Sequence, residues 1–278
     1  MLNVIQSSWQ HDPLEKMPKC YLCGNDGIIK RIYNSSDKYQ KLIGINDDTR
    51  VWYVCKACKL MWQTNCLTES SLKDIYSHYR DTNFRNESIE QIFNRVNNLN
   101  PRESENFYRY HWFENHIGGT PRDILDIGSG FGIWPNMLSK NGWRVTCIEP
   151  NKESCLFIRE YLKLHCLNSY GLEGVENQYD VASVIHVLEH ISKPLGFLEA
   201  VKASLVYNGK LFVEVPDATE FKYLESEHDE FNSTHLFMYD VASLYNLLSR
   251  LFFVTDIHRV YYESRGLYRI MALCSNIE

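Results

Sequence analysis

The chain has 278 residues and a formal net charge of −6. This length is enough for one α/β domain and a small additional module. The sequence has neither an apolar run long enough to span a bilayer nor a basic, apolar leader, so we expect a cytoplasmic protein with reduced cysteines. No cluster of lysine and arginine forms a basic stripe, and a nucleic-acid partner is therefore not expected.

Two Cys-x-x-Cys pairs stand near the N-terminus, Cys20 with Cys23 and Cys55 with Cys58. Each pair presents two thiolates to one ion, and four thiolates suit tetrahedral zinc. Short β-like runs between the pairs are typical of a zinc ribbon. Four protein ligands leave no open coordination position, so the zinc is expected to be structural. A redox pair is the alternative, although it would need a flanking βαβ pattern.

The next segment, 67–118, has helical periodicity that is interrupted at Asn100-Pro101. Two helices are expected here, over 88–99 and 103–116, as a cap on a ligand cleft. The second helix is rich in aromatic residues: Phe107, Tyr108, Tyr110, Trp112 and Phe113. Aromatic faces can bind a cation. A stripe at helical spacing more often belongs to a core, which is the interpretation that we favour.

A glycine-rich turn follows a short apolar run that ends near Asp126, with glycines at 128, 130 and 132. A second apolar run over 145–148 ends at Glu149-Pro150. A strand, a tight glycine turn, a helix and a second strand tipped with an acid form a half-site for a nucleoside. The glycines let the backbone pass close under a ligand, and Glu149 can accept hydrogen bonds from both ribose hydroxyls.

A dinucleotide is an alternative ligand for this turn. A dinucleotide site needs the spacing G-x-G-x-x-G, which places a pyrophosphate on a helix N-terminus. The spacing here is G-x-G-x-G, and Asp126 would repel a pyrophosphate while it suits a ligand with an ammonium group. A tight strand-to-helix turn without any ligand is the other alternative.

From residue 123 onward the pattern alternates between strands and helices. Strands are predicted over 124–127, 145–148, 166–170, 181–185, 211–215, 253–261 and 268–274. Helices are predicted over 134–141, 154–164, 196–204 and 241–251. Only a turn separates the last two strands, so they should pair in antiparallel fashion. The prediction is an α/β fold with a doubly wound, mostly parallel seven-stranded sheet.

The glycine motif with Asp126 resembles the first motif of the class I S-adenosylmethionine (SAM)-dependent methyltransferases. Leu188-Glu189-His190 is similar to a Leu-Glu-His triplet of their small-molecule members. The two cysteine pairs, the apolar strand 60–62 and the helix-like run 72–79 resemble one branch of these enzymes, which has an N-terminal zinc-binding domain. That branch acts in bacterial deoxysugar and surface-polysaccharide pathways.

The resemblance covers nearly the whole chain and implies three parts. A zinc ribbon would occupy 1–66, a helical linker or cap 67–118, and a Rossmann-like methyltransferase domain 119–278. SAM would lie across the carboxyl ends of the strands. Position alone places Leu172 on the adenine ring and Glu173 at its exocyclic amine. The residues expected to bind the cofactor are Asp126, Gly128, Gly130, Glu149, Pro150, Leu172, Glu173 and His186.

An alcohol acceptor needs a base within hydrogen-bond reach. The candidates are His235, His190 and Glu189. His235 ends the run Asn232-Ser233-Thr234-His235, where sugar C-methyltransferases of this branch carry Tyr-His-Glu-His. The missing Tyr, first His and Glu weaken the C-methylation hypothesis. Structural roles are the alternatives: His235 would pin its loop, and Glu189 with His190 would begin a helix.

The sequence therefore predicts an O-methyltransferase that acts on a sugar or related polar small molecule, or on a glycan, in surface-polysaccharide biosynthesis. C-methylation of a nucleotide deoxysugar and methylation of a phosphorylated acceptor are alternatives within enzymes. A third alternative is a non-catalytic binding module that recruits a partner through the ribbon. The intact Asp126, Gly128, Gly130 and Glu149 argue against it.

Overall fold

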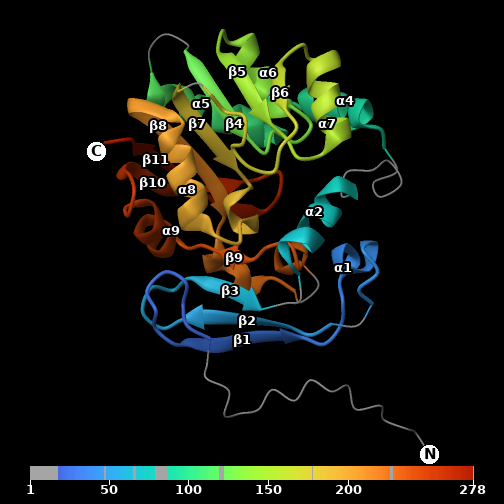
Figure 1. Cartoon of the computed structure of the whole chain (residues 1–278), viewed down its shortest axis with the longest axis vertical. Coiled ribbons are helices and arrows are strands. Elements are labelled where there is room, and N and C mark those ends of the chain that lie inside the picture. Colours follow the sequence, from blue (N-terminus) through green and yellow to red (C-terminus); the bar gives the residue numbers. More distant parts are fainter. Residues whose placement is uncertain are drawn as a thin grey trace, which may run out of the picture.

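The computed structural model describes residues 18–46, 48–64, 67–78, 87–118, 122–176, 178–225 and 228–277. Two sheets organise these residues, a seven-stranded sheet and a four-stranded sheet, which lie at opposite ends of the molecule (Figure 1). Within the described ranges, no helix is long and apolar enough to cross a membrane.

The seven-stranded sheet has the order β10-β11-β8-β7-β4-β5-β6. Its strands β4 to β8 run parallel to one another, whereas β11 is antiparallel to both β8 and β10. The predicted mostly parallel sheet with a terminal hairpin is thus confirmed. Its strands are β4 (Asp123–Ile127), β5 (Arg144–Ile148), β6 (His165–Leu167), β7 (Tyr179–Ile185), β8 (Leu205–Pro216), β10 (Phe253–Tyr262) and β11 (Leu267–Ser275).

Helices cover both faces of this sheet because neighbouring residues of a strand point to opposite sides. On β4, Ile124 packs with α5 (Glu105–Ile117), α6 (Ile133–Lys140) and α7 (Lys152–Glu160). Leu125 belongs to the other core, with α8 (Pro194–Ala203) and α9 (Val241–Leu248). Tyr110, Phe113 and the partly buried Trp112 of α5 pack in the first core, as the favoured interpretation predicted, whereas Tyr108 is exposed.

Several predicted boundaries differ from the structure by a few residues. β6 ends at Leu167 rather than 170, and β8 begins at Leu205 rather than 211. Helix α7 ends at Glu160 rather than 164, before Lys163 adopts a positive φ of 58° that a helix does not allow. Helix α4 (Ile89–Asn97) was predicted over 88–99. It begins after Ser88, whose side chain caps it.

The four-stranded sheet is antiparallel and has the order β1-β2-β3-β9. Its strands are β1 (Gly27–Tyr33), β2 (Arg50–Cys55), β3 (Met61–Thr64) and β9 (Phe237–Met238). A Cβ on Gly27 would lie 2.6 Å from the Trp62 ring, so only glycine fits there. Strand β9 was not predicted, because two residues are too few to show a period. It joins the N-terminal sheet to the C-terminal half of the chain.

Short helices complete the structure around the two sheets. Helix α1 (Lys38–Leu42) is capped by the side chain of Asp37 and was not predicted. Helix α2 (Glu69–His78) lies between the two sheets (Figure 1). Four 3₁₀ helices also occur in the described ranges: η1 (Pro101–Glu103), η2 (Leu188–His190), η3 (Ala218–Tyr223) and η4 (Asp229–Phe231).

Candidate active site

A cavity of about 790 Å³ opens beyond the carboxyl ends of the parallel strands. Its wall also includes residues of α2 and of the segment 229–235. Eight of the residues predicted from the sequence line it together: Gly128, Glu149, Pro150, Glu173, His186, Glu189, His190 and His235. Tyr76, from the run 72–79, lines it as well, and so do Glu230 and Arg269, which were not predicted.

The turn after β4 requires glycine at its first position. Gly128 has a φ of +75°, and a Cβ there would lie only 2.4 Å from Cγ2 of Val187. The N–H groups of Gly128 and Ser129 donate to the carbonyl oxygen of Ile148 at 2.8 and 3.0 Å, which ties the turn to β5. The bare backbone of Gly128 therefore forms part of the cavity wall.

Glu149, at the end of β5, has a buried carboxylate on the same wall. Its Oε2 accepts a hydrogen bond from the N–H of Gly130 at 2.7 Å, and its Oε1 accepts one from the N–H of Asn151 at 2.9 Å. A carboxylate has about four acceptor sites. The two backbone bonds orient Glu149 on the wall of the cavity.

Three of the predicted cofactor residues lie behind this wall. Asp126 is buried, and its Oδ1 accepts from the hydroxyl of Ser183 on β7 at 2.6 Å. Burial raises the pKa of Asp126 to about 6. Gly130 directs its N–H at Glu149, and Leu172 packs against the hydrophobic core. In this structure the three residues support the wall.

The residues of the wall fit SAM, the cofactor that the sequence resemblance implies. A glycine turn that a Cβ would fill allows close approach of a ligand. A buried carboxylate such as that of Glu149 is the kind of acceptor that a ribose needs, and Glu173 lies on the same wall beyond β6. Gly128, Glu149, Pro150 and Glu173 would therefore hold SAM.

Two imidazoles, His190 and His235, lie side by side at another part of the cavity, with ring centroids 4.7 Å apart. Nδ1 of His190 is 2.9 Å from the carbonyl oxygen of Thr234, and Nδ1 of His235 is 2.9 Å from that of Glu230. A carbonyl oxygen only accepts, so each Nδ1 must carry the hydrogen. In the neutral rings, each Nε2 then holds a lone pair.

The environment of His190 keeps its ring neutral. Burial and the neighbouring His235 lower the pKa of His190 to about 4, although Glu189 opposes them. At neutral pH this ring is thus in the form that can accept a proton.

His186 connects the imidazole pair to the interior. It has a φ of +53°, and its ring lies 3.5 Å from Oε1 of Glu189 and 3.1 Å from Oε1 of Glu214. Burial lowers the pKa of His186, but hydrogen bonds with these two carboxylates have a larger, opposite effect. The resulting pKa of His186 is raised to about 9. Its positive charge helps to lower the pKa of buried Glu189 to about 2. His186 lines the cavity, but its nitrogens point to protein carboxylates.

Behind His186 lies a buried ion pair that the sequence did not predict. Arg109 of α5 donates to both carboxylate oxygens of Glu214 on β8, at 2.7 and 2.6 Å, and the hydroxyl of Tyr262 adds a bond of 3.2 Å. Burial raises the pKa of Glu214, but the Arg109 guanidinium lowers it well below its usual range. Glu214 therefore stays ionised beneath His186.

The charge of His186 should make stability depend on pH. Its folded-state pKa is raised, so its contribution is complete below about pH 6.5 and is lost as the pH rises through about 9. Glu189, Glu214 and Arg269 are the charged groups that face it. We expect the free energy of unfolding, from urea titrations between pH 6.5 and 9, to fall more steeply in the wild type than in His186→Gln. Exposed His165→Gln is the control; equal slopes in the wild type and His186→Gln would contradict this account.

The four predicted zinc ligands meet at one end of the N-terminal sheet. The Sγ atoms of Cys20 and Cys58 are 3.5 Å apart, those of Cys23 and Cys55 are 3.4 Å apart, and all four lie within 4.8 Å of one another. Tetrahedral zinc with Zn–S bonds of about 2.3 Å needs separations of about 3.8 Å. The cysteines are not joined by disulfides. The cluster fits a structural zinc ion.

Metal analysis of the purified protein should find one equivalent of zinc. Cys55→Ser should unfold the N-terminal sheet and leave the seven-stranded sheet formed, because the metal substitutes for a large core in a small module. Circular dichroism and hydrogen exchange would show this. Absence of metal, or a disulfide between the pairs, would refute it.

Ligand atoms of Glu189, His190 and His235 also lie within 4.8 Å of one another. A second equivalent of metal that is lost in His235→Ala would show that these three residues bind metal.

Comparisons with known proteins agree with this geometry. A family model described as a methyltransferase domain matches residues 80–253. The ubiquinone biosynthesis O-methyltransferase of Stutzerimonas stutzeri is 26% identical over 153 residues, which cover 49% of this chain and 64% of that protein. Its counterpart in Aeromonas salmonicida is 28% identical over 153 residues, with coverage of 49% and 58%. The match thus spans less than two thirds of these relatives.

Solved structures share the fold. The 1,6-didemethyltoxoflavin-N1-methyltransferase of Burkholderia thailandensis, solved with S-adenosylhomocysteine (SAH), aligns with a TM-score of 0.55 at 17% identity and covers 82% of this chain and 96% of that chain. The magnesium protoporphyrin IX methyltransferase of Synechocystis, also with SAH, gives a TM-score of 0.54 at 14% identity and covers 73% and 98%. At these identities the likeness concerns the fold alone.

Proposed function

Because the chain belongs to the methyltransferase-domain family, whose model matches more than half of its length, we propose that it transfers the methyl group of SAM to a hydroxyl oxygen of a sugar or related polar small molecule. SAM, when bound, supplies an electrophilic methyl carbon on a positively charged sulfur. The protein has to hold the acceptor oxygen in line with that carbon and remove its proton.

The observation that carries this proposal is that one cavity joins the Gly128–Glu149 wall to the paired imidazoles. His235 is the proposed base, because its Nδ1 is held by Glu230 and its Nε2 has the lone pair. Oε2 of Glu230 lies 3.7 Å from Nδ1 of His235. His190 supplies a second neutral imidazole beside it.

The unsatisfied polar atoms of the cavity support a polyhydroxylated acceptor. Glu189 Oε2, Glu230 Oε2 and Arg269 Nε are buried and have no hydrogen-bond partner in the described part of the chain. Such atoms usually bind a ligand or water. Two acceptors and one donor match hydroxyl groups, which both donate and accept.

Two observations bear on which atom receives the methyl group. The departure of the 232–235 run from the C-methyltransferase pattern favours oxygen over carbon, and the names of the curated relatives describe O-methyltransferases. Those names also favour a second candidate acceptor, a precursor of ubiquinone. Surface-polysaccharide biosynthesis is proposed as the pathway on the sequence resemblance alone.

The acceptor class can be tested by mass spectrometry after incubation with SAM. The panel would contain sugar nucleotides, free glycans, phosphorylated sugars and a dihydroxybenzoate. We expect one methyl group on a sugar hydroxyl. Methylation of the dihydroxybenzoate alone would support the second candidate, and a carbon-linked methyl group would overturn the choice of oxygen.

A further inference from the structure

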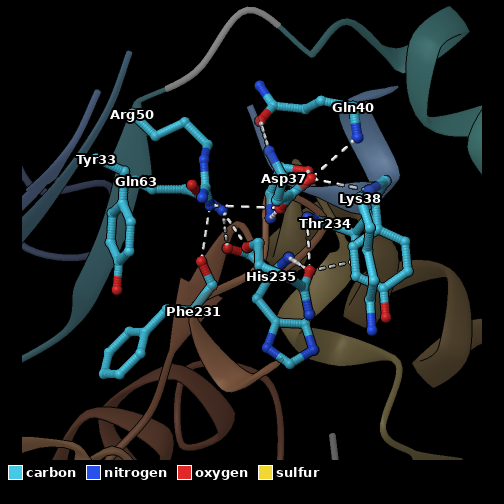
Figure 2. A network of polar contacts seen from close by, with 12 residues as sticks. Tyr33, Asp37, Lys38, Gln40, Arg50, Gln63, Phe231, Thr234 and His235 are labelled. Carbon is cyan, nitrogen blue, oxygen red and sulfur yellow. Dashed lines mark hydrogen bonds and ion pairs between the residues drawn. The ribbon is translucent and has the colours of Figure 1, made fainter. Parts of the chain in front are cut away.

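The segment 229–236, which carries His235, is bound along its length by the N-terminal sheet (Figure 2). A guanidinium nitrogen of Arg50, on β2, donates to the carbonyl oxygen of Phe231 at 2.7 Å. The side-chain amide of Gln63, on β3, donates to the carbonyl oxygens of Asn232, at 2.9 Å, and of His235. Both side chains are buried and come from strands far from residue 235 in the sequence.

Two further contacts complete this attachment. Asp37, which caps α1, accepts from the backbone N–H of Ser233 and from its hydroxyl at 2.9 Å. The same carboxylate lies 3.6 Å from Arg50, and the backbone N–H of Gln63 donates to the carbonyl oxygen of Leu236 at 3.1 Å. Figure 2 shows Arg50, Gln63 and Asp37 close to Phe231, Thr234 and His235 of the segment.

Six carbonyl oxygens of the segment accept from two kinds of donor. Those of residues 231, 232, 235 and 236 accept from the N-terminal sheet. Those of Glu230 and Thr234 accept from Nδ1 of His235 and of His190. The backbone that selects the tautomer of both imidazoles is thus held in place by Arg50, Gln63 and Asp37.

We propose that Gln63, Arg50 and Asp37 are positioning residues for the imidazole pair. Through the segment 229–236 they fix the two carbonyls that hold the Nδ1 hydrogens, and this leaves the Nε2 lone pairs of His190 and His235 available. If the segment shifts, the carbonyls move away and the Nε2–H tautomer, which cannot act as a base at Nε2, becomes populated. The catalytic meaning of this arrangement rests on the proposed function.

The chemistry of the two strands supports a specific role. Arg50 Nε and Gln63 Oε1 are buried and lack a partner within the described ranges. Burial of a guanidinium or an amide is unfavourable unless hydrogen bonds compensate for the lost hydration. Apart from the contact of Arg50 with Asp37, the side-chain bonds of Arg50 and Gln63 are made to the segment 229–236. An apolar side chain would suit the interior of a sheet that served only as a scaffold.

The test uses full-length protein labelled with ¹⁵N in histidine. Long-range ¹H–¹⁵N NMR spectra distinguish the two tautomers of each ring, and His190→Gln and His235→Gln assign the signals. Gln63→Leu removes the amide but keeps a side chain of similar size. Thr64→Val, on the same strand with an exposed side chain, is the matched control.

In the wild type and in Thr64→Val, we expect both rings in the Nδ1–H form. In Gln63→Leu we expect a mixture of tautomers at His235 and His190, with an unchanged affinity for SAH. A folded Gln63→Leu protein with wild-type tautomers would overturn the proposal. If this variant does not fold, the same spectra are recorded for Arg50→Lys, with the same expected result and the same contradicting result. The readout needs no acceptor, so its failure is distinguishable from failure of the proposed methyl transfer.

Discussion

Replacing His235 by alanine is expected to lower the rate of methyl transfer by about 10²–10⁴-fold, the usual contribution of a general base. The affinity for SAM should barely change, since His235 lies on the segment 229–236 and the cofactor wall follows β4 and β5. Single-turnover rates with the acceptor identified by mass spectrometry would measure the first effect, and calorimetry the second.

Two companion variants make this result decisive. His165→Ala removes an exposed histidine on β6 and should leave the rate unchanged. His190→Ala tests the neighbouring ring, whose lowered pKa of about 4 already keeps it neutral. If His190→Ala loses activity while His235→Ala keeps it, the base is His190. If neither change matters, transfer depends on positioning alone.

Glu149→Ala is expected to weaken SAM binding by about 1.5–3 kcal/mol, the range for loss of hydrogen bonds to a charged group. The N–H groups of Gly130 and Asn151 already orient the Glu149 carboxylate. Its side chain therefore loses little conformational entropy when the ribose binds. Calorimetric titration with SAH would measure the change.

The control for this variant is Glu153→Ala, which removes an exposed carboxylate in the first turn of α7. Its affinity should equal that of the wild type. An equally large loss in Glu153→Ala would point to long-range electrostatics, and no loss in Glu149→Ala would remove the basis for assigning the ribose to Glu149.

Local patterns in the sequence were enough to predict the seven-stranded sheet and to bring Gly128, Glu149 and Pro150 to one cavity wall. A glycine turn after an apolar strand, followed by an acid after the next strand, is a short-range signal that the backbone geometry of Gly128 explains. The carboxyl ends of adjacent parallel strands meet at one edge, so residues after β4, β5 and β7 had to lie close together.

The remaining features depend on contacts between residues far apart in the chain. Arg109 and Glu214 are separated by 105 positions. No local sequence pattern around either residue indicates that they form an ion pair. Gln63 contacts the carbonyl of His235 across 172 positions. A tautomer is selected by backbone carbonyls, whose direction depends on how the segment is held. No period or motif encodes such contacts.

Methyl transfer from SAM to an oxygen atom can be followed by ¹³C NMR with SAM that is labelled at its methyl carbon. The protein would be incubated with labelled SAM and a small-molecule extract, because a methoxy carbon is distinguished by its chemical shift whatever the acceptor is. We predict a new methoxy signal with the wild type that builds up much more slowly with His235→Ala, and with Glu149→Ala when SAM is below saturation. A new carbon- or nitrogen-bound methyl signal, or SAM that stays intact in every extract tested, would contradict the account.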